Sequence, residues 1–262
     1  MHLYTNILGL SIPSYGLMIT IGTIIGNLIA FILIKKYKFD FNDFIILEAY
    51  CLLGAFIGAK ALFILVSISS IDWTQITNLQ YLNSMMQGGF VFYGGLIGGL
   101  LFIFLGGFLH KIPVRDYITK FIFLIPFIHA FGRIGCFMAG CCYGVPYHGF
   151  GSVIYPDNSF ALSGIELFPV QLVEASLLLV ISGSILFLQL KKAFDYTIEF
   201  YFFFYGIVRF ILEFYRYDFA RGHLGILSTS QWISCAVIII AILSITIRLV
   251  KRKKLAGERR VN

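Results

Sequence analysis

Two arginines stand in apolar surroundings, where a charge is costly. Arg133 lies near the end of the apolar run 121–137, and Arg209 lies inside a second apolar run, 200–214. An arginine in hydrocarbon costs at least about 2.5–3.5 kcal/mol on insertion scales, so a membrane segment keeps one mainly where it binds something. A guanidinium presents several donors in a fork that matches phosphate oxygens. The pair therefore predicts an anion-binding site.

Around Arg209, polar residues recur at helical spacing. Tyr205, Arg209 and Glu213 are four residues apart, and Arg216 lies three residues beyond Glu213. On an α-helix this spacing places a phenol, a guanidinium, a carboxylate and a second guanidinium on one face. Glu213 is expected to neutralise one arginine of this face and to leave the other free. For Arg216 the alternative is snorkelling to the membrane interface.

Around Arg133, a second polar stripe is expected. His129, Arg133 and Cys136 stand at positions i, i+4 and i+7, which share a helix face. Other polar residues near the outer ends of apolar segments are Tyr15, Gln171 and Glu174. Together these residues predict a polar, anion-binding cavity that opens outward and sideways to lipid.

Three cysteines, Cys136, Cys141 and Cys142, form a C-x4-C-C cluster. A disulfide from Cys136 to one of the other two, a nucleophilic thiol activated by Arg133, and plain packing all remain open. The spacing matches no common zinc pattern, so neither a metal site nor a cofactor is predicted. The remaining cysteines are isolated in apolar segments and are expected to pack there; they are Cys51 and Cys235.

The composition indicates what kind of elements must position these residues. The chain has 262 residues, of which 59% are hydrophobic and only 13% charged, whereas a soluble domain carries about 25% charged residues. We therefore expect an all-α polytopic membrane protein, a single transmembrane domain over residues 1–262. Seven segments approach the length of a membrane helix: 14–34, 42–67, 88–109, 118–139, 169–190, 197–215 and 231–250. The first lacks a cleavage pattern and is expected to be retained rather than removed as a signal peptide.

The distribution of charge predicts the orientation of these segments. Fifteen of the 20 basic residues follow the first, third, fifth and seventh segments, whereas the loops 68–87 and 140–168 contain none. The positive-inside rule then places the N-terminus outside and the C-terminus in the cytoplasm. The net charge of +7 is thus explained by orientation and lipid headgroups, not by nucleic acid. The loop 140–168 is expected to form a small extracytoplasmic subdomain, with a short hairpin at 149–155.

Glycines concentrate at 88–99. Gly94 and Gly95 belong to overlapping small-xxx-small pairs, which allow helices to approach closely. Gly88 and Gly89 are alternatively the start of a broken or re-entrant segment that lines a cavity. Lys60, a further charge in an apolar segment, is expected to be structural or to snorkel.

The order of the motifs resembles one family. The series is Tyr-Gly-Leu-Met at 15–18, Gly-Gly-x-x-Phe-Tyr-Gly-Gly-Leu-Ile-Gly at 88–98, Gly-Arg-Ile-Gly-x-Phe…Gly at 132–144, Pro-x-Gln-Leu-x-Glu at 169–174 and Tyr-Gly-x-x-Arg-Phe-x-x-Glu-Phe-x-Arg at 205–216. From about Tyr15 to Trp232 the chain resembles the prolipoprotein diacylglyceryl transferases, seven-span enzymes of the bacterial cytoplasmic (inner) membrane. The resemblance implies transfer of a diacylglyceryl group from phosphatidylglycerol, or a similar anionic phospholipid, to the lipobox cysteine thiol of a prolipoprotein signal peptide. Glycerol 1-phosphate would be released.

The resemblance also implies roles for individual residues. Arg133 and Arg209 would bind the lipid phosphate and stabilise the leaving group, with Glu213 orienting the arginines. Residues implied to line the substrate site are Tyr15, Tyr205, Arg216, Gln171, Glu174, Gly94, Gly95 and Gly144.

The chain departs from the family pattern at several positions, among them Tyr217-Asp218 in place of the usual Pro-Asp. Tyr93 stands where the family usually has a histidine, and Cys136 and Cys141 replace the usual asparagine and glutamate. Tyrosine, with a reference pKa near ~10, is a poor base at neutral pH. The base could be Tyr93 with a perturbed pKa or His129, or the acceptor thiol could arrive already ionised. Two rival functions stay open: a paralogue with another lipid or glycan acceptor, and a transporter of a small anion or lipid.

Overall fold

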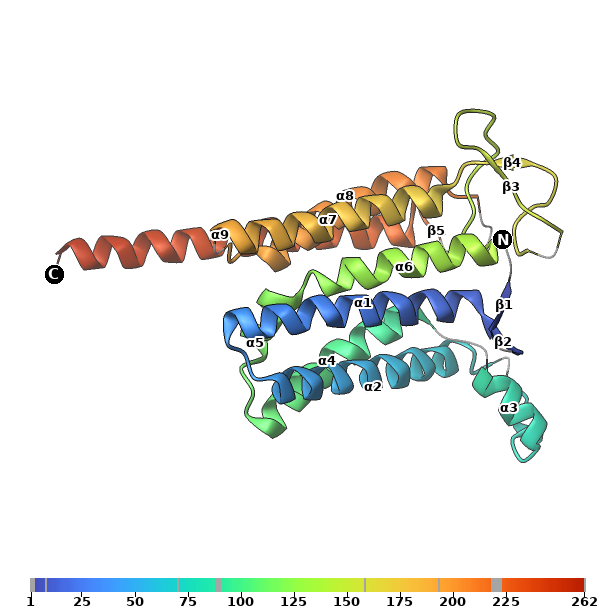
Figure 1. The fold of residues 1–262 in the computed structure, drawn as a ribbon, viewed down its shortest axis with the longest axis horizontal. Helices are drawn as coiled ribbons and strands as arrows, with labels where there is room; N and C mark the ends of the chain where they lie inside the picture. Colours follow the sequence, from blue (N-terminus) through green and yellow to red (C-terminus); the bar gives the residue numbers. More distant parts are fainter. Residues whose placement is uncertain are drawn as a thin grey trace. The chain divides into compact units, whose positions relative to one another are not determined.

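Helices α1 to α9 form most of the chain in the computed structural model, which describes residues 3–7, 9–69, 71–87, 91–157, 159–192, 194–217 and 223–261 (Figure 1). The chain divides into two compact units. One comprises Met1–Ala30 and Ile118–Asn262, and the other comprises Phe31–Tyr117. Every sequence-predicted arginine and cysteine of the candidate site belongs to the first unit.

The first unit is a layer of long helices. Its elements are the hairpin β1 (Tyr4–Ile7) and β2 (Leu10–Pro13), the first part of α1 (Ser14–Tyr37), α6 (Leu124–Ala139), α7 (Val170–Lys192), α8 (Thr197–Leu212), the short helix η2 (Glu213–Tyr215), the pair β5 (His223–Leu224) and β6 (Leu227–Ser228), and α9 (Thr229–Val261). Helix α7 packs between α6 and α8, and α8 packs on α9 (Figure 1). Between α6 and α7 the core contains Ala130, Ala175 and Leu178, whose small or compact side chains let the two helices approach.

Helix α6 does not continue the helix before it. Helix α5 (Val114–Phe121) and α6 form a pair bent by 51° at a short break. Pro126 lies at the start of α6. Proline has no N–H to bond the carbonyl four residues earlier, so it is tolerated in a first turn but not inside a helix. The single segment predicted at 118–139 is therefore broken into two helices.

The second unit contains α2 (Phe41–Val66), η1 (Trp73–Gln75), α3 (Leu79–Gln87) and α4 (Phe92–His110). Helices α2 and α4 lie side by side (Figure 1). A Cβ added at Gly58 would overlap the carbonyl oxygen of Gly94, and one added at Gly98 would overlap that of Gly54. The close helix packing predicted for this glycine run is confirmed, and Gly95 also faces α2, at Ala55. Gly88 and Gly89 lie outside the described residues.

Lys60 lies in the same unit. Its ammonium group is buried and donates to the backbone carbonyl of Met85, between α2 and α3. The structural role predicted for this lysine is confirmed.

The protein is a polytopic membrane protein. In the described part of the chain, five helices are long and apolar enough to cross a membrane, or six if the bent α5–α6 pair is one span. The predicted segment 197–215 forms α8 and η2. The 16 residues of α8 extend about 24 Å at 1.5 Å per residue, which is less than the ~30 Å of a hydrocarbon core. Seven spans and their orientation remain predictions.

The loop 140–168 is ordered by backbone pairing. Strand β3 (Val153–Ile154) pairs antiparallel with β4 (Glu166–Leu167). The hairpin expected at 149–155 is therefore wrong, because Val153 pairs with Leu167 and Ile154 with Glu166, beyond that range, and 149–152 forms only a turn. The base of the loop is joined to the end of η2, where Val145 N–H donates to the Tyr215 carbonyl at 3.0 Å.

Candidate functional site

The two predicted arginines meet at one carboxylate. Glu174, in the second turn of α7, is 1% exposed. Its Oε2 atom lies 3.0 Å from Arg133 Nε and 3.8 Å from Arg209 Nη1. Arg133 Nε makes no hydrogen bond with a described residue, so its contact with Glu174 is an ion pair. Because α7 packs between α6 and α8, its carboxylate bridges arginines that are far apart in the sequence.

Arg209 is held on its other side by its own helix and by α9. Its Nη2 atom lies 2.7 Å from Glu213 Oε2, the contact that the four-residue spacing predicts, and donates to Ser230 Oγ at 3.2 Å. The neutralisation of one arginine by Glu213 is confirmed. Ser230 is a site residue that sequence reasoning missed, since a lone serine at the start of an apolar helix gives no signal of its own.

Tyr205 completes the environment of Glu174. Its hydroxyl donates to Glu174 Oε1 at 3.3 Å. The Tyr205 ring lies edge-on to His129, with the ring centroids 5.3 Å apart. The predicted stripes on α6 and α8 therefore face each other across Glu174.

Several positive charges lie around Glu174. Arg133, Arg209 and Arg216 act on this carboxylate electrostatically, and a second carboxylate, Glu213, contacts Arg209. Arg209 Nη1 is buried and has no hydrogen-bond partner among the described residues. A buried donor without a hydrogen bond costs about 1–3 kcal/mol, and more when it is charged. The cluster is therefore suited to receive an anion.

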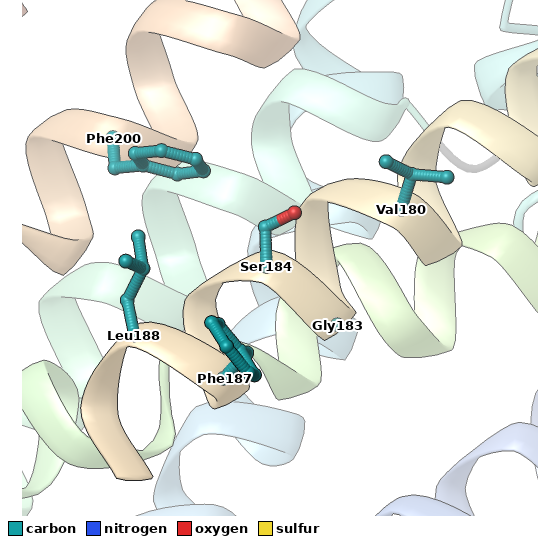
Figure 2. Close-up of a pocket in the computed structure, with 6 residues that line it drawn as sticks. All are labelled: Val180, Gly183, Ser184, Phe187, Leu188 and Phe200. Atoms are coloured by element: carbon teal, nitrogen blue, oxygen red, sulfur yellow. The ribbon is translucent and has the colours of Figure 1, made fainter. Parts of the chain in front are cut away.

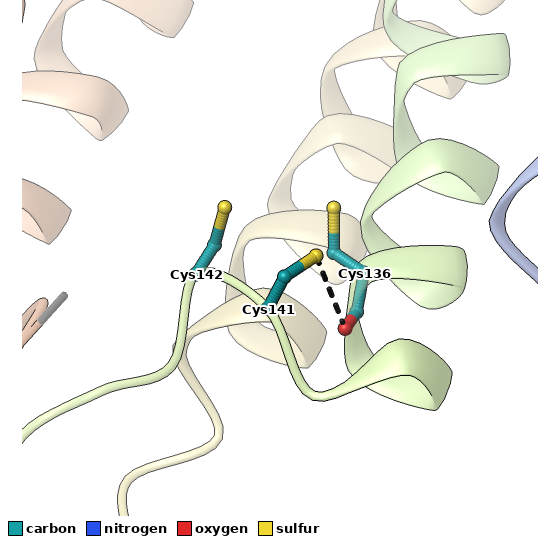
Figure 3. A group of neighbouring side chains, drawn as sticks. All are labelled: Cys136, Cys141 and Cys142. Atoms are coloured by element: carbon teal, nitrogen blue, oxygen red, sulfur yellow. Dashed lines mark hydrogen bonds between the residues drawn. The ribbon is translucent and has the colours of Figure 1, made fainter. Parts of the chain in front are cut away.

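The three clustered cysteines lie at the C-terminal end of α6. Gly140 adopts φ 77° and its N–H bonds back to the carbonyls of Cys136 and Phe137, while Cys141 N–H bonds to the Cys136 carbonyl at 3.1 Å. This Schellman turn brings a residue and the one five positions later together. The three sulfur atoms all lie within 4.8 Å of one another (Figure 3). All three thiols are free, so no disulfide joins them here.

Cys142 has an unusual backbone and an unusual thiol. Its φ of 58° is in the left-handed region, which non-glycine residues rarely adopt. The Cys141 thiol donates to the Cys136 carbonyl at 3.7 Å (Figure 3). The neighbouring thiols, Cys136 before Cys141, and then the guanidinium groups of Arg216 and Arg133, lower the pKa of the Cys142 thiol.

Gln171 and Gly144 hold the turn that carries the cysteines. Gln171 is buried; its amide donates to the Cys141 carbonyl at 2.9 Å and accepts from the Tyr155 hydroxyl at 3.3 Å. A Cβ at Gly144 would overlap the carbonyl oxygen of Phe168, so the backbone passes too closely there for any other residue. Substrate binding by Gln171 and Gly144 stays a prediction, while their contacts make them part of the framework.

The remaining predicted residues are placed as follows. Tyr15 is the second residue of α1 and lies against α6, since a Cβ at Gly135 would come within 2.9 Å of the Tyr15 Cα. Tyr93, Gly94 and Gly95 belong to the second unit, and their part in the site stays a prediction.

An apolar groove lies between α7 and α8. It has a volume of about 470 Å³ and does not include the charged cluster (Figure 2). Its lining residues are Val180, Gly183, Ser184, Phe187, Leu188 and Phe200. The groove and Glu174 are both on α7, so one helix carries a polar site and an apolar site in succession.

Known proteins match the chain over nearly its whole length. A model of the family described as "Prolipoprotein diacylglyceryl transferase" matches residues 3–247. Phosphatidylglycerol--prolipoprotein diacylglyceryl transferase 2 of Clostridium perfringens is 34% identical, with 97% of this chain and 98% of that protein covered. The corresponding transferase of Clostridium tetani is 32% identical, with 90% and 93% covered. The chain belongs to the prolipoprotein diacylglyceryl transferase family.

Proposed function

We propose that the protein transfers a diacylglyceryl group from phosphatidylglycerol to the lipobox cysteine thiol of a prolipoprotein and releases glycerol 1-phosphate. The observation that carries this proposal is the pair of buried arginines that share Glu174, with a buried Arg209 Nη1 that makes no hydrogen bond among the described residues. The names of the relatives supply the substrates. The enzyme would act in the bacterial cytoplasmic membrane as one domain of seven spans, with the N-terminus and the loop 140–168 outside.

The leaving group explains why the site needs two arginines. The acceptor thiolate attacks the glyceryl carbon of the lipid, a C–S bond forms, and the C–O bond to phosphate breaks. The electron pair of that bond passes to the phosphate oxygen, so the phosphate gains one negative charge in the transition state. Guanidinium groups fixed by Glu174 and Glu213 need no reorganisation to stabilise that charge. Arg133 and Arg209 are the proposed catalytic residues.

The apolar groove supports a lipid as the donor. Counting 1.5 Å per residue, its lining begins roughly 9 Å from Glu174 along α7 at Val180 and ends roughly 21 Å away at Leu188. A phospholipid with its phosphate at the arginines could place an acyl chain along these residues. Tyr15, Tyr205 and Arg216 would contact the headgroup, and His129 or Tyr93 would accept the thiol proton.

The test uses purified protein, labelled phosphatidylglycerol and a lipobox peptide. A thioether-linked product is expected, and Arg133→Ala or Arg209→Ala should abolish it. Arg248→Ala is the matched control, because Arg248 forms an ion pair with Glu199, 2.6 Å away and at the other end of α8. Absence of product beside an active control enzyme would overturn the proposal in favour of another acceptor. Lipid or anion flux through vesicles without product would instead indicate a transporter.

A further inference from the structure

The three sulfur atoms at the end of α6 have the spacing of metal ligands. Thiolates about 2.3 Å from a tetrahedral zinc ion lie roughly 3.8 Å from one another. The sulfurs of Cys136, Cys141 and Cys142 lie within 4.8 Å of one another, so an inward movement of about an ångström brings them to this spacing. Rotation about the Cα–Cβ bonds covers such a distance without moving the backbone.

The backbone that presents these thiols is fixed from several sides. The Schellman bonds of Gly140 and Cys141 hold the turn against the Cys136 carbonyl. Gln171 bonds the Cys141 carbonyl from α7. Cys142 is kept in a left-handed conformation that costs roughly 1–2 kcal/mol for a residue with a Cβ. Such strain persists where the surroundings determine the conformation, and it occurs often at functional sites.

We propose that Cys136, Cys141 and Cys142 bind one thiophilic metal ion, for which Zn²⁺ fits best, and that its fourth position receives the acceptor thiol. Three protein ligands and one open position is the arrangement of catalytic zinc sites, whereas structural sites are closed by four. Among the described residues these cysteines are the group that offers three ligand atoms this close together. The C-x4-C-C spacing did not predict a metal because the turn, and not the spacing, brings the sulfurs together.

The cysteines lie beside Arg133, where a bound metal ion could activate the acceptor thiol. Cys136 lies three residues after Arg133 on α6, and residues three apart on a helix have Cβ atoms about 5–6 Å apart. A thiol bound at the open position would therefore lie next to the phosphate that Arg133 is proposed to hold. A thiol that coordinates zinc is deprotonated, which would supply the thiolate in a chain with tyrosine at position 93.

The step balances without any redox change. The acceptor thiol would lose its proton to the proposed base, His129 or Tyr93, on binding zinc, and its sulfur would attack the glyceryl carbon. The C–O bond breaks toward the phosphate, and the neutral thioether, a weak ligand, leaves the zinc ion. This second half of the proposal rests on the proposed function, whereas metal binding does not.

The chemistry argues against the same cysteines as covalent carriers. An enzyme thiol that took the diacylglyceryl group would become a thioether. Passing the group on would require breaking that C–S bond with a thiolate as the leaving group. The intermediate and the product are both thioethers, so this second transfer has no driving force. A thiolate cluster that binds a cation avoids this difficulty.

Metal binding is tested with the full chain in detergent. The variant Cys51→Ser/Cys235→Ser keeps only the three clustered thiols and is the matched control. It should bind about one zinc ion per chain, and added Co²⁺ should give sulfur-to-cobalt charge-transfer absorption. Replacing the three cysteines by serine should remove both signals while the helical circular dichroism stays unchanged. The proposal is overturned if the control variant, with three thiols shown to be reduced, binds neither ion.

A disulfide is a distinct outcome of the same experiment. Two of the three thiols would then be missing in thiol counting and would return on reduction. If the reduced protein still binds no zinc, the cluster is a redox pair and the metal proposal fails.

The acceptor half is tested on the cobalt-loaded protein without any lipid. A lipobox peptide should change the visible cobalt spectrum, and the same peptide with serine in place of cysteine should not. Identical spectra with both peptides would overturn the acceptor role. Failure of the transferase proposal would be seen separately, as metal binding and a peptide-dependent spectrum without thioether product from phosphatidylglycerol.

Discussion

Glu174→Gln removes the charge that the two arginines share and keeps the shape of the side chain. Arg133 Nε and Arg209 Nη1 lie 3.0 Å and 3.8 Å from Glu174 Oε2. At an effective dielectric constant near 20, Coulomb's law gives about 5.5 and about 4.4 kcal/mol for the two pairs. Desolvation offsets part of this energy, and removing one partner of a buried pair typically costs about 3–5 kcal/mol. We expect a loss of that size in the free energy of unfolding.

The two arginines should respond differently to this change. Arg209 keeps Glu213 at 2.7 Å, whereas Glu174 is the carboxylate that contacts Arg133 in the described part of the chain. Two double-mutant cycles pair Glu174→Gln with Arg133→Gln and with Arg209→Gln. The coupling energy should be larger in the cycle with Arg133. A displaced Arg133 should also lower kcat/KM for phosphatidylglycerol by about a hundredfold, the usual cost of a misplaced positioning group.

The assay is denaturation in mixed micelles, followed by circular dichroism, together with product formation. Glu199→Gln is the control, because Glu199 is buried and ion-paired with Arg248. It should destabilise the protein without changing KM for the lipid. A loss of less than about 1 kcal/mol for Glu174→Gln, or a stronger coupling to Arg209 than to Arg133, would refute the reasoning.

Three further predictions follow from space and backbone conformation. Gly58→Ala should lower the free energy of unfolding by about 1–3 kcal/mol through overpacking, whereas Gly16→Ala, with open space at its Cβ position, should be nearly neutral; denaturation compares them. Gly183→Leu should fold normally, since nothing lies within 4 Å of its Cβ position, but should shift lipid use toward shorter acyl chains in competition assays. Cys142→Gly should have a free energy of unfolding about 1 kcal/mol higher than that of Cys142→Ala in denaturant titrations, because glycine accepts the left-handed conformation. Equal free energies would show that no strain is stored.

The sequence predicted the helices better than their breaks. Hydropathy located α1, α2, α4, α7 and α9, because a membrane helix needs a long apolar run and little else. It did not predict the break before α6, although Pro126 was visible, because proline inside an apolar run is also compatible with a kinked helix. The hairpin within 140–168 failed for a different reason. Pairing between β3 and β4 depends on the long connection between them, which local composition does not determine.

The candidate site was predictable where it follows one helix. The four-residue spacing gave the contact of Arg209 with Glu213, since helix geometry alone decides it. The bridging position of Glu174 and the bond from Ser230 depend on how α6, α7, α8 and α9 pack, and no spacing along the chain contains that information. The same limit concealed the meeting of the three sulfurs, which requires the left-handed backbone of Gly140 and Cys142.

Arg133 lies a short distance along the chain from the turn that carries Cys141 and Cys142, and this has a mechanical consequence. A bilayer of different thickness changes the tilt of helices that cross it. Arg133 and Cys142 are separated by only nine positions, all within α6 and its terminal turn. Tilting therefore carries both as one body, and the gap between them is set by intrahelical geometry. Turnover should then vary little between thin and thick bilayers, as long as the lipid can still enter.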